Sequence, residues 1–124
     1  MSTDPGLHRS VHPSHMDGYI VGNEAFSPTS EENYKLSVDC EKVWSAKQSF
    51  LFRTKTLGKK SSGIWTLPRE IYVRLALAIE VDIKHDNPAH SLIVFPKSDK
   101  ARRRDAARRL AALANNTAAV SLLG

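Results

Sequence analysis

The sequence contains a single cysteine, Cys40, among its 124 residues. One cysteine cannot form an intramolecular disulfide, and it cannot build a cysteine-based structural zinc site. Because Cys40 stands in an alternating apolar segment, we expect it to be a small core residue. No apolar run approaches the roughly 18–20 residues that cross a bilayer. The N-terminus lacks the charged-then-apolar pattern of a secretion signal, so we expect a protein that is not secreted.

The chain also lacks the motifs of common enzyme classes. It has no glycine-rich phosphate loop, no nucleophile elbow and no histidine–carboxylate metal motif. Three histidines near the N-terminus have no carboxylate or cysteine spaced to complete a metal site; they are His8, His12 and His15. His85 and His90 flank a turn beside Asp86, with no positioned nucleophile. We therefore expect no enzymatic activity, no metal, no cofactor and no small-molecule substrate.

Basic residues are scarce at the start of the chain and abundant after it. Residues 1–34 contain one basic residue, Arg9, and carry a net charge of −4, whereas residues 35–124 carry +9. A compact basic body predicts a polyanionic partner, most often a nucleic acid. The alternative is that the net charge of +5 only keeps the protein soluble.

Alternation of apolar and polar residues predicts strands over most of the chain. Residues 1–17 have two prolines and no periodicity, which predicts a flexible N-terminal arm before a single domain over 18–124. Alternation over 35–40, 43–56 and 71–83, followed by the segment SLIVFP at 91–96, predicts strands as far as about residue 96. The β-branched content of 71–83 favours a strand there. A helix is the competing interpretation, because Thr66–Glu70 resembles a capping box with an early proline.

The C-terminal part of the chain has helical signals. Ser98 is placed as an N-cap with Asp99 in the first turn, and Asn115-Asn116 can end the helix. We expect helices over about 99–115 and 117–123. Strands followed by helices predict an α+β fold, with an antiparallel meander covered on one face by the two helices.

Two surfaces are candidates for function. An apolar stripe of Ala106, Leu110 and Leu113 predicts that the first C-terminal helix docks on a sheet. Its five arginines then form a solvated outer face, although they could instead grip a nucleic acid. On the predicted sheet, basic and aromatic side chains point away from the apolar face and are RNA-binding candidates, unless they are only a solvated face; these are Lys47, Arg53, Lys55, Tyr72 and Arg74.

The segment IVFPKSDKARRRDAARRLAALANNTAAVSLL, residues 93–123, resembles the coat proteins of single-stranded RNA bacteriophages. The resemblance implies a homodimer in which two chains pair edge to edge into one continuous sheet, with the helices of each chain lying across its partner's half. Dimers would assemble into an icosahedral capsid around the RNA genome. The inner sheet face would bind an RNA hairpin and repress replicase translation. The protein would then occur in the virion, and in the bacterial host cytoplasm during assembly.

A second resemblance gives an alternative function. GIWTLPREIYVRLAL, residues 63–77, is similar to swapped-hairpin DNA-binding antitoxins and transition-state regulators, in which a strand ending in Leu-Pro leads into a short helix. This implies a dimeric transcription regulator that binds duplex DNA through Lys59, Lys60 and Arg69. A strand over 71–83 favours the coat protein, and a helix from Pro68 to about Leu77 favours the regulator.

Overall fold

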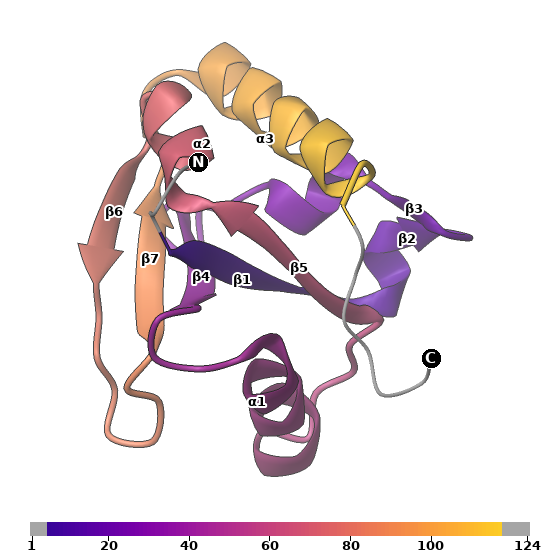
Figure 1. Cartoon of the computed structure of the whole chain (residues 1–124). Helices are drawn as coiled ribbons and strands as arrows, with labels where there is room; N and C mark the ends of the chain where they lie inside the picture. The colour runs from indigo at the N-terminus through magenta and orange to yellow at the C-terminus, as the bar shows by residue number, and fades with distance from the viewer. Residues whose placement is uncertain (1–4, 118–124) are drawn as a thin grey trace.

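The computed structural model describes residues 5–117, which form a five-stranded antiparallel sheet with helices on both faces (Figure 1). The strand order is β5–β1–β4–β7–β6. These strands are β1 (Gly6–Val11), β4 (Lys35–Cys40), β5 (Gly63–Pro68), β6 (Ala78–Val81) and β7 (His90–Val94). The α+β class with an antiparallel sheet is therefore confirmed. The order is not that of a simple meander, because β1 lies between β4 and β5.

Helices and short turns connect the strands. A separate hairpin pairs β2 (Met16–Asp17) with β3 (Ile20–Val21). The helices are α1 (Ala46–Leu51), α2 (Arg69–Arg74) and α3 (Lys100–Ala114). The short helical turns are η1 (Pro13–His15), η2 (Asn23–Phe26) and η3 (Phe52–Thr56), the last with π-helical geometry. No helix in the described part of the chain is long and apolar enough to cross a membrane.

The prediction of a flexible arm over residues 1–17 is wrong for the residues that form β1. This strand pairs with β5 from Gly6 to Val11 and with β4 on its other side. Leu7 and Val11 are buried in the core. The apolar content of the strand is low because its alternate residues, His8 and Ser10, line a polar cleft on the opposite face. The sequence pattern therefore conceals a central strand.

The strand predicted over 43–56 is also wrong, because residues 46–56 form α1 and η3. Ser45 and Gln48 form a reciprocal capping box at the start of α1. The Ser45 hydroxyl accepts from the Gln48 backbone N–H at 3.2 Å, and the Gln48 side-chain oxygen accepts from the Ser45 backbone N–H at 2.8 Å. These bonds satisfy N–H groups that a helix start otherwise leaves without partners. The capping residues therefore determine a helix here, although apolar and polar residues alternate as in a strand.

Residues 71–83 do not form one strand either. Pro68 ends β5, α2 follows directly, and the chain then turns through Ala76 at φ 59° before β6. The local order of strand, Leu-Pro and short helix is the one expected for the swapped-hairpin regulators. Pro68 is the N-cap of α2 and makes no side-chain capping bond. Its ring fixes φ at −58° and it has no N–H for a further ladder bond, which ends the strand at this residue.

Helix α3 covers one face of its own chain's sheet (Figure 1). Asp99, not Ser98, is the N-cap, and its carboxylate accepts from the Arg102 N–H at 3.0 Å. Ala106 and Leu110 are buried as predicted, but Leu113 is 38% exposed. The buried stripe instead continues through Ala107, Ala111 and Ala114. The helix predicted over 117–123 lies outside the described residues, apart from Thr117.

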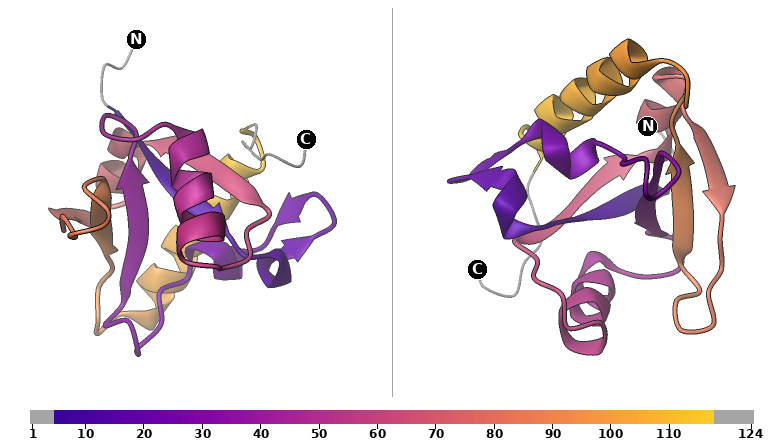
Figure 2. Two further views of the ribbon diagram at one scale, coloured as in Figure 1. Left: turned by 90° about the horizontal axis from the view of Figure 1, so that it is seen from below. Right: turned by 180° about the vertical axis from the view of Figure 1, so that it is seen from behind.

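The two faces of the sheet differ in character. Helices α2 and α3 and turn η2 lie over one face, where Leu36, Val38 and Ile93 contribute to the core. Cys40 is half-buried and packs against this core. Helix α1 lies on the opposite side, against β1 and β5 (Figure 2). Helix α1 does not cover the polar side of β4 and β7, and a cleft lies there.

Candidate functional site

A cleft of about 240 Å³ lies on the open face of the sheet. Its floor is formed by His8 and Ser10 from β1 and by Ser37 and Asp39 from β4. One wall comes from the end of α1, turn η3 and the loop after it. The other comes from the β6–β7 connection, residues 82–89, with the start of β7. The cleft therefore joins four segments that are distant in the sequence.

Hydrogen bonds fix the polar side chains of the floor. His8 and Asp39 are directly opposite in the β1–β4 register. The ring nitrogens of His8 lie 2.7 Å from the Thr66 hydroxyl and 2.8 Å from the Trp44 carbonyl oxygen. The Asp39 carboxylate accepts from the Asn87 amide at 2.8 Å and from the Ser49 hydroxyl. These bonds tie the floor to both walls, so the cleft has a defined shape.

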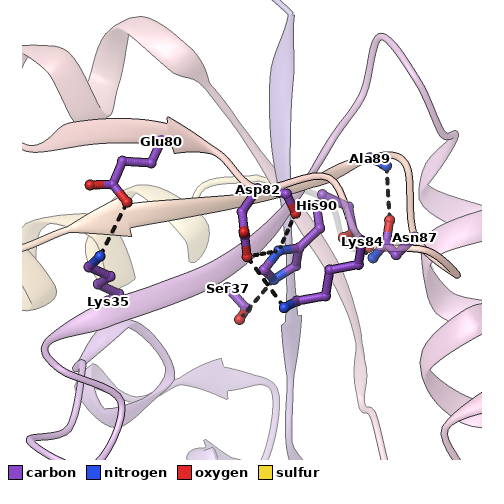
Figure 3. A network of polar contacts seen from close by, with 9 residues as sticks. Lys35, Ser37, Glu80, Asp82, Lys84, Asn87, Ala89 and His90 are labelled. Carbon is purple, nitrogen blue, oxygen red and sulfur yellow. Dashed lines mark hydrogen bonds and ion pairs between the residues drawn. The ribbon is translucent and has the colours of Figure 1, made fainter.

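His90 links three neighbouring segments of the sheet on this face (Figure 3). Its Nδ1 lies 3.0 Å from the Asp82 carboxylate and 3.0 Å from the Asp82 carbonyl oxygen. Its Nε2 lies 3.2 Å from the Ser37 hydroxyl. Ser37 is paired with Leu92, so His90 reaches it diagonally across the β4–β7 pair. The result is a line of carboxylate, imidazole and hydroxyl.

A second cavity, also of about 240 Å³, adjoins the cleft. Ser10, Arg53 and Lys59 line both, so the two lie side by side. The described residues around the second cavity contribute four cationic side chains and no carboxylate. Its lining consists of Arg9, Ser10, His12, His15, Arg53, Lys59 and Lys60. Such an arrangement attracts anions.

Arg9 supplies a positive charge from inside the protein. Its Nε donates to the Ala25 carbonyl at 2.9 Å, and its Nη1 donates to the Ser37 carbonyl at 3.0 Å. Burial lowers the pKa of Arg9 to about 10, and the nearby Arg53 charge acts in the same direction. Arg9 is therefore still protonated at neutral pH, and two close guanidinium groups add to the positive potential of the cavity.

The structure does not bring the five predicted RNA-binding residues together on a sheet face. Arg53 lines both cavities. Lys47 is exposed on α1, and Lys55 is exposed on η3. Arg74 is exposed on α2 and lies 3.7 Å from the Glu70 carboxylate. Tyr72 is fully buried, so it cannot stack on a base.

Burial raises the pKa of Tyr72 strongly, and its hydroxyl has no hydrogen-bond partner among the described residues. Tyr72 is a core residue, and the alternation pattern misassigned it to an outer face. Its unpartnered hydroxyl lowers the stability of the fold, because a buried polar group without a hydrogen bond costs free energy.

Sequence reasoning missed most of the residues that line the cleft. Ser37 belonged to a correctly predicted strand, but its alignment with His90 depends on the pairing of β4 with β7. Lys59 and Lys60 lie between Gly58 and Gly63 in the sequence and were predicted only as DNA contacts of the alternative function. Their approach to His12 and His15 required β1 to be placed beside β5, which the predicted flexible arm had excluded.

Comparisons of the chain with models of protein families, with curated proteins and with solved structures found no match. Among residues 5–117, no three histidine, cysteine, aspartate or glutamate side chains are grouped so that they could hold a metal ion. The site is therefore interpreted from its own geometry.

Proposed function

We propose that this protein binds single-stranded RNA, with backbone phosphates held in the cationic cavity and in the adjoining cleft. The observation that carries the proposal is the second cavity, where four cationic side chains surround a space with no carboxylate in its described lining. The neighbouring cleft, which Arg53 and Lys59 also line, favours a chain-like ligand over an isolated anion, because several phosphates can then be bound in succession.

The shape of the site favours an unpaired strand over a duplex. The cations line concave spaces, which a single strand can enter and a duplex cannot. Phe52 lines the cleft and packs against Trp44 with ring centroids 5.1 Å apart, so an aromatic side chain is available for a base to stack on.

The DNA-binding alternative depends on residues that do not converge. Lys59 and Lys60 precede β5, whereas Arg69 follows it at the opposite end of the strand. The three side chains therefore do not form one patch for a duplex, although the strand–helix order of this segment agrees with that resemblance.

The arginines of α3 lie outside the proposed site. Arg103 donates to the carbonyl oxygens of Pro96 and Lys97, at 2.9 and 2.7 Å, and its guanidinium lies 4.0 Å above the Tyr34 ring centroid. Asp105 pairs with Arg108 at 2.6 Å and with Arg109 at 2.9 Å. The hydrogen bond from Arg108 and the charges of both arginines lower the pKa of Asp105. Three of the five arginines of α3 therefore make contacts within the protein, which stabilise the helix and the loop before it.

The double substitution Arg53→Glu/Lys59→Glu is expected to weaken binding of an unstructured RNA oligonucleotide on the order of 100-fold at 0.1 M salt, because it removes two phosphate contacts and adds repulsion. The slope of log affinity against log salt should fall in magnitude by about 1.4, at roughly 0.7 per phosphate of a single strand. Fluorescence anisotropy at several salt concentrations measures both quantities.

A matched control carries the same charge change on α3, as Arg104→Glu/Arg109→Glu, and should lose much less affinity. Tyr72→Phe should leave binding unchanged, because that side chain is buried. Equal losses in the two double variants would show that only net charge matters and would contradict the assignment to the cavity.

A role as a coat protein is the larger form of the same proposal, and it requires dimers. The single strand over 71–83 that would favour this role is not formed, so its support is limited to the cationic cavity and the edge of the sheet. The strand at the sheet edge, β6, pairs only with β7 among the described residues. Val81 on β6 is 76% exposed, and Ile83 beyond it is 69% exposed. β6 is only four residues long and includes Glu80, but an edge strand with exposed apolar side chains can still pair with a second strand. We propose that two copies pair along β6 to continue the sheet.

The variant Val81→Lys/Ile83→Lys is expected to be monomeric, because lysines on an edge strand prevent edge-to-edge pairing. Light scattering after size exclusion should show a dimer for the unaltered protein, and negative-stain microscopy with RNA should show closed particles. Val43→Lys is a control at a distant position that is 48% exposed. A monomer at all concentrations, with or without RNA, would contradict both the dimer and the coat role.

A further inference from the structure

We propose that Ser37, His90 and Asp82 form a hydrolytic site for carboxylic esters that carry a negative charge. The proposal does not rest on RNA binding. It rests on the line of carboxylate, imidazole and hydroxyl in the cleft (Figure 3), which has the relative geometry of a nucleophile, a general base and an orienting acid.

The surroundings of His90 determine which ring nitrogen is the base. Both groups that face Nδ1, the Asp82 carboxylate and the Asp82 carbonyl oxygen, are hydrogen-bond acceptors. We therefore assign the ring proton to Nδ1. Nε2 then has a free lone pair 3.2 Å from the Ser37 hydroxyl, which can donate its proton to it. This distance is suitable for general-base activation of a serine.

The sheet holds the three residues in place. Asp82 donates its backbone N–H to the His90 carbonyl at 3.0 Å, which fixes it beside the histidine. His90 is only 8% exposed, so its ring has little freedom to turn away. Ser37 is half-buried on the cleft floor, where a substrate can reach its hydroxyl. Lys84 lies 3.4 Å from the Asp82 carboxylate and helps to hold it.

Ser37 and His90 are the proposed catalytic residues, and Asp82 is a positioning residue. The Ser37 oxygen attacks the ester carbonyl carbon while His90 Nε2 takes the hydroxyl proton. The tetrahedral adduct then breaks its bond to the alcohol oxygen, and His90 returns the proton to the departing alcohol. Water attacks the acyl-serine and gives its proton to His90. The carboxylic acid leaves, and Ser37 recovers its proton.

The charge of the cleft selects the class of ester. Arg53, Lys59 and Lys84 line the same space as Ser37, together with Asp39 and Asp86, and the four-cation cavity adjoins it. The Asp39 carboxylate accepts hydrogen bonds from Ser49 and Asn87, so the anionic group of a substrate is expected on the side of Arg53 and Lys59. An anionic group on the substrate can be bound there while the ester carbonyl lies at Ser37. We expect 4-acetoxybenzoate to be hydrolysed faster than its neutral methyl ester.

The first test is covalent labelling of the full chain with a fluorophosphonate probe, which reacts with activated serines. Labelling should be located on Ser37 by mass spectrometry and should disappear in Ser37→Ala. Ser27→Ala is the control, because Ser27 lies outside both cavities and its hydroxyl donates to the Asn23 carbonyl oxygen at 2.8 Å. It should be labelled like the unaltered protein. No labelling of the unaltered protein, or labelling of another serine, would overturn the proposal.

Two further variants separate chemistry from folding. His90→Gln is expected to slow labelling at least tenfold with an unchanged far-ultraviolet circular dichroism spectrum. Asp82→Asn should lower the maximal labelling rate and move the pH at which the rate is half-maximal, which loss of packing alone would not do. An unchanged labelling rate in His90→Gln would refute the base. Arg53→Glu/Lys59→Glu should lose the preference for the anionic ester, and a retained preference would refute that selectivity.

Discussion

Deletion of residues 1–11 is expected to abolish cooperative folding of the remaining chain. The deletion removes β1, which pairs with β5 along six residues and with β4 on its other side. Both neighbours would lose their backbone partners, and the core would lose Leu7 and Val11. Stabilities of small domains are only about 5–15 kcal/mol, so the loss of a central strand exceeds what they can tolerate.

Thermal unfolding followed by circular dichroism measures this effect. The truncated chain should show no sigmoidal transition. A deletion of residues 1–4 is the matched control, because it leaves β1 whole, and it should keep a cooperative transition. A folded protein after deletion of 1–11 would mean that this segment is an arm, as the sequence pattern suggested.

The second large effect is expected from Leu110→Ala, which should destabilise the protein by about 3 kcal/mol. Leu110 is fully buried where α3 meets the core, so its removal leaves a cavity. The midpoint of thermal unfolding should fall by about 10–15 °C for a chain of this size.

Leu113→Ala is the control on the same helix. It removes the same side chain from a position that is 38% exposed, and we expect a cost below about 1 kcal/mol. Denaturant unfolding of both variants gives the two free energies. Equal costs would mean that Leu113 is buried against a partner chain, as the intertwined dimer implies.

Alternation and helix periodicity predicted some elements correctly because those elements are decided locally. The segment 35–40 has one apolar and one polar face, and it is a strand. The helix at 100–114 has caps and a stripe of small residues, and it is a helix. Leu113 was misplaced because alanines at 107, 111 and 114 turn the buried stripe away from it.

The remaining elements could not be predicted from periodicity because two local signals compete there. A capping box at Ser45, and the missing backbone N–H at Pro68, override an alternating pattern. In β1 the pattern is weak, because Arg9 occupies a position between two core residues and is satisfied by carbonyl oxygens. His8 and Ser10 of β1 form part of the cleft floor. Because β1 was not predicted, the cleft could not be predicted either. Arg53 is the one predicted RNA-binding residue that it contains.

The pairing of β1 with β5 also has a consequence for how the protein forms during synthesis. Gly6 is paired with Pro68, so β1 leaves the ribosome well before the strand with which it forms that ladder. Such sequence-distant pairings raise contact order and slow folding, because the entropy of closing long loops opposes them. During synthesis β4 is made before β5, so the edge of β1 that later pairs with β5 stays open until residues 63–68 are made. The completed sheet then joins these distant segments into one cooperative unit.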